Sequence, residues 1–252
     1  MTDECRTILS ILNCDYELFK NERNAKEIID RFYDLLSQGE AEGFYPLIIL
    51  PSDNLVEFLI DSLENNDFEC TPEGMASYRQ SIIEKSKQID AKSFLATTLD
   101  EYLKRCTAED AILGQFEEVE SQNELTLHML AYGRYEEIII AKLPTKNPWE
   151  LAAWMPMGGW NECPMPEEQV AVFRYWHEKY GAIPVVVGSD IWEMTLTNPP
   201  LTAEEAEKLA KEHFAFGCES ETIRGLASTL KDSTIWFFGG INVIFNHLRF
   251  QG

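Results

Sequence analysis

A segment of twenty residues, Asn147–Pro166, constrains the fold of this chain more than any other part. It reads NPWELAAWMPMGGWNECPMP, with three tryptophans, four prolines and a Gly-Gly pair, and it follows neither a helical nor a strand period. Irregular segments of this length are uncommon inside compact domains. Each buried indole removes roughly 150–250 Å² of surface from water, which offsets the entropy lost on ordering the chain. We therefore expect a fixed, shaped segment anchored to the rest of the fold.

The chain carries a large and uneven negative charge. Its 252 residues include 21 lysines and arginines against 43 aspartates and glutamates, a net charge of −22. Residues 1–140 hold 12 basic and 29 acidic side chains, whereas residues 141–252 hold 9 and 14. A surface of this sign repels phosphate groups, so we expect neither nucleic acid nor an anionic membrane as a partner. A basic protein partner fits the first region, and solubility alone is the simpler interpretation of the same charge.

The cysteines, histidines and glycines show no metal or cofactor signature. None of the six cysteines forms a C-x-x-C pair, and the four histidines lack the H-x-x-x-H spacing of a metal site. Gly158-Gly159 lacks the strand and helix context of a phosphate-binding loop. We therefore expect no metal and no cofactor. The first residues do not resemble a secretory signal and no apolar run approaches 18 residues, so we expect a cytoplasmic protein.

Hydrophobic periodicity predicts an α+β fold in two regions. Residues 1–120 read as an acidic, mainly helical αβ region with a buried strand at Tyr45–Leu50, and one of its helices is expected to end at Gly39. Residues 121–252 read as an α+β domain that opens with a hairpin, whose second arm is Tyr135–Leu143. Strand and helix patterns then follow in β-α-β-β-α-β order with an extra helix. This order predicts a ferredoxin-like antiparallel sheet with helices on one face.

Four short stretches of the second region resemble one known family. They are GGWNECP (Gly158–Pro164), FRYWHEKYGA (Phe173–Ala182), Pro199-Pro200 ahead of TAEEAEKLAKEHFAF (Thr202–Phe216), and WFF (Trp236–Phe238). Their combination is similar to the uncharacterised bacterial domain-of-unknown-function family 4253, with a weaker likeness at Glu42–Leu50. Members often carry Cys-Pro-Asp where this chain has Gly217-Cys218-Glu219. The resemblance implies a shared fold and no activity.

The tryptophan-rich segment holds a candidate catalytic set. Cys163 follows Asn161 and Glu162, and His177 lies fourteen residues further on, in the next predicted helix. A cysteine nucleophile, a histidine base and an Asn or Glu that orients the base would form a hydrolase or transferase site. The alternative is structural, because a cysteine in such a position is commonly a small buried hydrophobe and a histidine beside the inward-facing Trp176 is commonly a packing residue.

The same segment is also a candidate recognition surface. Tryptophan is enriched at binding hot spots, and paired glycines let the backbone turn tightly. The candidate ligand- or partner-binding residues are Trp154, Gly158, Gly159, Trp160 and Asn161. Packing in the core is the competing interpretation, which stays open for Trp154 and Trp160.

The function expected from these observations is non-catalytic binding. One form of this hypothesis is an immunity-type or antitoxin-like protein that covers a basic target with its acidic region. The alternative is a small-molecule hydrolase or transferase that uses Cys163 and His177. A third hypothesis is a module that binds a small molecule in a groove between the two regions.

Overall fold

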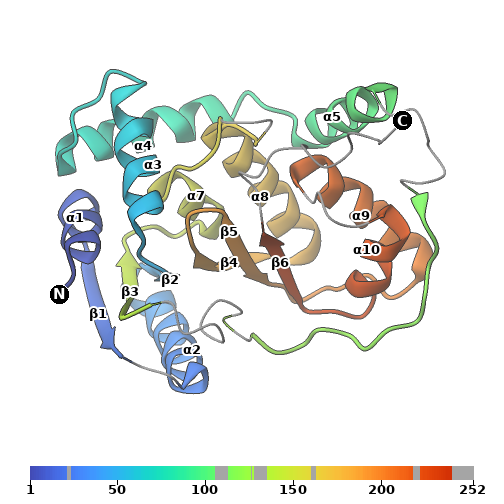
Figure 1. The fold of residues 1–252 in the computed structure, drawn as a ribbon, viewed down its shortest axis with the longest axis horizontal. Coiled ribbons are helices and arrows are strands. Elements are labelled where there is room, and N and C mark those ends of the chain that lie inside the picture. Colours follow the sequence, from blue (N-terminus) through green and yellow to red (C-terminus); the bar gives the residue numbers. More distant parts are fainter. Residues whose placement is uncertain are drawn as a thin grey trace, which may run out of the picture.

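The computed structural model describes residues 1–21, 24–105, 113–125, 127, 135–159, 163–217 and 222–239. Within these residues a mixed six-stranded sheet runs through the centre of the molecule (Figure 1). Its strands are β1 (Asp15–Lys20), β2 (Tyr45–Ile49), β3 (Glu137–Leu143), β4 (Ile183–Val187), β5 (Ile191–Thr195) and β6 (Ile235–Gly239). Their order across the sheet is β1-β3-β2-β4-β5-β6. Every neighbouring pair is antiparallel except β2 and β4, which are parallel.

The sheet joins the two regions that the sequence separates at residue 120. β2 comes from the first region and lies between β3 and β4 of the second. Ile48, for example, pairs with Ile140 on one side and with Val186 on the other. The α+β class is therefore confirmed, but the ferredoxin-like arrangement is not found, because a strand from outside the second region separates β3 from β4, β5 and β6. Sequence periodicity identifies strands and does not reveal which strands are neighbours.

Helices cover both faces of the sheet. They are α1 (Asp3–Leu12), α2 (Ala25–Glu42), α3 (Asp53–Glu64), α4 (Pro72–Ser86), α5 (Ala91–Arg105), the 3₁₀ turn η2 (Pro148–Glu150), α7 (Leu151–Trp154), α8 (Pro166–Tyr180), α9 (Ala203–Gly217) and α10 (Ile223–Leu230). Alternate residues of each strand point to opposite faces, so the core forms two clusters. The larger one packs most of the helices against the face that includes Ile139, Trp192 and Phe238. The smaller one packs α2, a helix of the first region, against the face that includes Ile48 and Ile140. The buried hydrophobic residues of α7, α8, α9 and α10 all belong to the larger cluster, so the prediction of helices on one face is confirmed for these helices of the second region.

Local sequence explains most helix ends. Ser52 and Thr71 cap the starts of α3 and α4. Their hydroxyl oxygens accept the backbone N–H groups of Leu55 and Gly74, respectively. Gly181 ends α8 in the left-handed conformation. The predicted end at Gly39 is wrong: α2 continues to Glu42, and Gly43 takes the left-handed position at its end.

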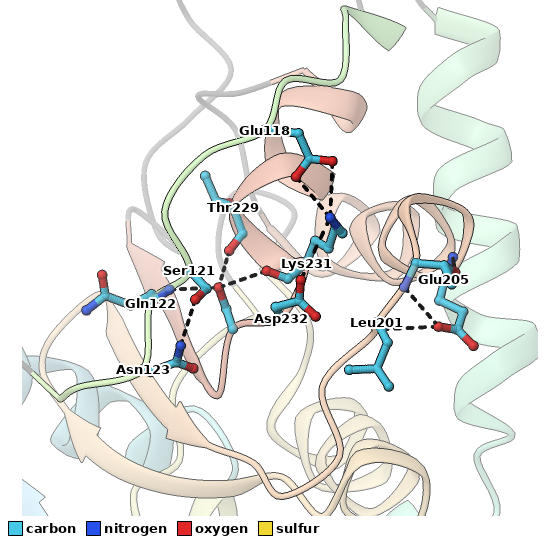
Figure 2. Close-up of polar contacts among 11 residues, drawn as sticks. Glu118, Ser121, Gln122, Asn123, Leu201, Glu205, Thr229, Lys231 and Asp232 are labelled. Atoms are coloured by element: carbon cyan, nitrogen blue, oxygen red, sulfur yellow. Dashed lines mark hydrogen bonds and ion pairs between the residues drawn. The ribbon is translucent and has the colours of Figure 1, made fainter.

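A connecting strap, residues 113–125, runs past α10 to the face of the sheet that carries the smaller core cluster. Figure 2 shows how it is held: Glu118 pairs with Lys231 at 2.9 Å, and the backbone N–H of Gln122 donates to the hydroxyl of Ser233. Leu125, the last residue of the strap, is buried in the smaller core cluster. The hairpin predicted here has its second arm in β3, whereas Leu125 and Leu127 are not in a strand, and the rest of its first arm lies outside the described residues. Among the described helices none is long and apolar enough to cross a bilayer.

Candidate functional site

The tryptophan-rich segment is a buried structural element with a short helical core. It contains η2 and α7, and Glu150 accepts hydrogen bonds at its carboxylate from Thr145 and Asn147, at 2.5 and 2.9 Å. Trp154, at the end of α7, is only 5 % exposed. The guanidinium of Arg79 lies 3.4 Å from the centre of its indole ring, a cation–π contact. Met155 and Met157, which lie between α7 and the paired glycines, are also buried.

Gln169 anchors this segment to the sheet. Its side chain is buried on the first turn of α8 and donates from Nε2 to the carbonyl oxygens of Met157 and Pro164, at 2.6 and 3.0 Å. Its Oε1 accepts the indole N–H of Trp192 on β5 at 3.2 Å. One amide therefore ties both ends of the loop to the central sheet. The expected fixed attachment is confirmed for the described residues of the segment.

The paired glycines are required by this close approach. Gly158 and Gly159 have φ angles of +105° and +78°, which residues other than glycine rarely adopt. A Cβ at Gly158 would collide with the carbonyl oxygen of Pro164 and with the Gln169 amide. The glycines thus allow the loop to close over Gln169, and this packing accounts for them without a ligand.

The structure does not bring Cys163 and His177 together. Burial raises the pKa of the Cys163 thiol to about 12, and its Sγ lies 3.8 Å from the Gln169 amide at the start of α8. His177 lies eight residues beyond Gln169 on the same helix, about 12 Å along its axis. Its Nδ1 is 3.0 Å from the carbonyl oxygen of Ala182, and its ring packs on that of Trp149. The contacts of the Cys163 and His177 side chains are therefore those of structural residues.

Three predicted site residues, Trp160, Asn161 and Glu162, lie outside the described residues. The hypothesis that they bind or orient a ligand stays a prediction. Of the remaining candidates, Trp154 is buried against Arg79 and only Gly159 is exposed. The described candidate residues of the segment therefore present little surface for recognition.

The sequence did not single out an aromatic cluster around Trp176. The Trp176 ring stacks on Phe238 with ring centres 5.4 Å apart and contacts Trp236 at 5.6 Å. His213 from α9 lies between Trp236 and Phe238, with 4.6 Å from its ring centre to each. In the described part of the chain, Nε2 of His213 and Nε1 of Trp236 are buried without a hydrogen-bond partner. The signal for His213 and Gln169 was available, because each is a polar residue on the apolar stripe of its helix.

An acidic hollow opens on the surface between β1 and α2. Its volume is about 580 Å³, and its charged lining residues are Glu17, Lys26, Glu27, Asp30, Arg31 and Asp34. The two cations are paired inside it: Arg31 forms two hydrogen bonds with Glu17, at 2.6 and 2.8 Å, and Lys26 lies 2.7 Å from Asp30. The Arg31 guanidinium holds the pKa of Glu17 below its usual value. The carboxylates outnumber the cations, so the hollow carries a net negative charge.

The hollow adjoins an edge of the sheet. β1 is the first strand in the sheet order and pairs only with β3 among the described residues. Tyr16 on this strand is 42 % exposed. An edge strand presents backbone N–H and C=O groups to which an extended segment of another chain can bind.

Comparison with known families identifies one part of the chain. Residues 139–239 match the family model of a domain of unknown function, DUF4253. The predicted resemblance is therefore confirmed for these residues, which include the tryptophan-rich segment and the aromatic cluster. No curated protein and no solved structure matches the chain.

The DUF4253 match begins inside β3 and excludes β2. Because β2 separates β3 from β4, the sheet of the matched residues is completed by a strand from the preceding region. The acidic hollow between β1 and α2 lies wholly outside the match. The likeness predicted at Glu42–Leu50 lies outside it too.

Proposed function

We propose that the protein is a non-catalytic binding protein whose acidic hollow takes a basic protein partner. The observation that supports the proposal is the position of the hollow, with a net negative lining, beside the edge strand β1. A basic extended segment could add to the edge strand through backbone hydrogen bonds while its lysines or arginines meet the carboxylates of α2. An immunity-type or antitoxin-like role is one form of this function.

The wider charge distribution agrees with this function. Residues 1–140, which include those of the hollow, hold most of the negative charge, with 29 acidic and 12 basic side chains. Long-range attraction of this kind speeds the association of oppositely charged proteins and weakens with salt. We further propose that the protein is bacterial and lies in the cytoplasm. Free thiols at Cys5, Cys14, Cys70 and Cys163 fit a reducing compartment.

The catalytic alternative has less support. A cysteine nucleophile needs a thiolate near neutral pH, and burial raises the pKa of Cys163 to about 12. The separation of Cys163 from His177 along α8 removes the expected base. The hydrolase or transferase hypothesis therefore rests on the residues of the loop that are not described.

The test is a comparison of charge-reversal variants in an affinity capture from native bacterial lysate. Asp30→Lys/Asp34→Lys changes two exposed residues of the hollow, and Glu69→Lys/Glu73→Lys makes the same change in net charge at exposed positions before and at the start of α4. The expected result is a basic protein that the wild type and the α4 variant retain at low salt and release at high salt, and that the hollow variant does not retain. Equal capture by both variants, or no salt-sensitive partner at all, would overturn the proposal.

A further inference from the structure

The helices α5, α8 and α9 neighbour one another (Figure 1). A second groove, remote from the acidic hollow in sequence, lies between them. Its volume is about 420 Å³, within the range of about 300–1,000 Å³ that is typical of small-molecule sites. Each helix contributes residues three or four positions apart, which is the spacing of one helical face. The groove joins the first region, through α5, to the DUF4253 residues of α8 and α9.

The wall that α5 contributes is apolar. It consists of Leu95, Ala96 and Leu99, of which Leu95 is buried, Leu99 is half-buried and Ala96 is exposed. These side chains present hydrocarbon to a groove that is open to solvent. Contact with an apolar group would remove that surface from water, which favours binding.

A hydrogen-bonded carboxylate forms the opposite wall. Glu212 on α9 accepts from the Tyr175 hydroxyl and from Lys179 Nζ, both at 2.8 Å, and from the Trp176 indole N–H at 3.1 Å. Lys179 also donates to the Tyr175 oxygen at 2.9 Å. The charge of Glu212 is thus balanced within the protein, and Tyr175 and Lys179 are held in fixed positions at the groove.

Lysines form the rim of the groove. Besides Lys179 they are Lys92 on α5 and Lys208 and Lys211 on α9. Lys208 and Lys211 each pair with a glutamate one turn earlier on α9, at 2.8 and 2.9 Å. Pairs of this kind on a helix surface contribute little to stability, so these ammonium groups can turn toward a ligand at little cost. Four lysines and one glutamate line the groove. When Glu204 and Glu207, the partners of Lys208 and Lys211, are counted as well, the lysines still outnumber the glutamates by one, so the rim keeps a small positive charge in a chain of net charge −22.

We propose that this groove binds an organic anion with an apolar tail, of the class of medium-chain carboxylates. The tail lies along Leu95, Ala96 and Leu99, and the carboxylate meets the ammonium groups of the rim. A free, single-tailed anion fits the volume of the groove. An anionic membrane does not fit, because the surrounding acidic surface repels it. The site is independent of the basic partner proposed above, since it has the opposite charge and different residues.

Binding of dodecanoate to the intact protein, followed by isothermal titration calorimetry below the micellar concentration, tests this assignment. Three comparison ligands separate the contributions: dodecyltrimethylammonium has the tail with the opposite charge, butyrate has the head without the tail, and phosphatidylserine vesicles present anionic lipid as a membrane. The expected result is one site for dodecanoate and binding at least about tenfold weaker for the other three. Equal binding of the cationic surfactant, or binding to vesicles in preference to dodecanoate, overturns the proposal.

Two pairs of variants locate the site. Lys92→Glu/Lys208→Glu reverses two exposed rim charges, and Lys87→Glu/Lys104→Glu makes the same change at exposed lysines that do not line the groove. Ala96→Trp fills the groove, and Thr97→Trp places the same ring at the adjacent exposed position of α5. We expect the first member of each pair to weaken dodecanoate binding about tenfold or more and the second to leave it unchanged. Equal effects within either pair overturn the proposal, and unchanged thermal unfolding of the four variants shows that the fold is retained.

Discussion

Two buried polar side chains in the DUF4253 part of the chain have opposite surroundings. Gln169 on α8 is 1 % exposed, and both ends of its amide are hydrogen-bonded. His213 on α9 is also 1 % exposed, yet its Nε2 has no partner in the described part of the molecule and its ring is enclosed by aromatic rings. The Gln169 amide fixes the path of an irregular segment, whereas the His213 side chain contributes packing and carries the cost of an unsatisfied nitrogen. Burial alone therefore does not show what a polar residue does in this fold.

The largest effect is expected from breaking the Gln169 anchor. Gln169→Leu has a similar volume but leaves the carbonyl oxygens of Met157 and Pro164 and the indole N–H of Trp192 without their partner. We expect a loss of about 3 kcal/mol in the free energy of unfolding, measured by urea denaturation. The control is Gln80→Leu at an exposed position of α4, which should change stability by less than about 0.5 kcal/mol. A Gln169→Leu protein as stable as this control would show that the amide is not an anchor.

A somewhat smaller loss is expected when the loop can no longer close over Gln169. Gly158→Ala places a methyl group against the Pro164 carbonyl at a φ of +105°, and we expect a cost of about 2 kcal/mol. Gly188→Ala is the matched control, because its Cβ would meet the nearest side-chain atom at 3.5 Å, an ordinary contact. Thermal unfolding of the two variants makes the comparison. A Gly158→Ala protein that unfolds at the same temperature as Gly188→Ala would contradict it.

His213 should make a smaller and pH-dependent contribution. Burial lowers its pKa from 6.5 to about 3. Above pH 6.5 the imidazole is neutral in both states and its titration does not affect stability. As the pH falls from 6.5 toward 3, the unfolded chain binds a proton that the folded protein does not, so the free energy of unfolding decreases. His213→Leu should remove this decrease.

The measurement is the difference in unfolding free energy between His213→Leu and the wild type. We expect the two to agree within about 1.5 kcal/mol at pH 7, and the difference to shift in favour of the variant by roughly 1–2 kcal/mol at pH 5. His177→Gln serves as the control, since His177 is partly exposed and hydrogen-bonded to Ala182. A difference that does not change between pH 7 and pH 5 would show that the folded protein protonates His213.

The contrast between these two residues also shows what the sequence could predict. The sequence predicts the succession of strands and helices in the second region, which includes α8, α9, β4 and β6, because burial of one face leaves a local pattern. The position of β2 between β3 and β4 was not, because strand neighbours are set by contacts between distant residues. The same limit applies to the site. Gln169 and His213 stand on apolar stripes, but the sequence does not show that Gln169 bonds to Met157, Pro164 and Trp192 or that His213 Nε2 has no partner among the described residues. The groove between α5, α8 and α9 is not predicted by the sequence because its residues belong to three helices.

The smallest change in stability, and a direct test of the catalytic alternative, concerns Cys163. Its thiol is 7 % exposed beside the Gln169 amide, and burial raises its pKa to about 12. We expect Cys163→Ala to cost about 1 kcal/mol, as for a small buried hydrophobe. The folded protein should alkylate at Cys70, which is exposed, well before it alkylates at Cys163. Iodoacetamide labelling at pH 7, mapped by peptide mass spectrometry, distinguishes the two sites.

Gln169→Leu connects this labelling to the anchor. If the amide keeps the loop closed over the thiol, the variant should label at Cys163 faster than the wild type while labelling at Cys70 stays the same. A nucleophile activated for catalysis predicts the reverse order in the wild type, because a thiolate present at pH 6–7 reacts faster than an ordinary exposed thiol. Rapid labelling of Cys163 in the folded wild type would therefore contradict a purely structural cysteine and support a catalytic loop.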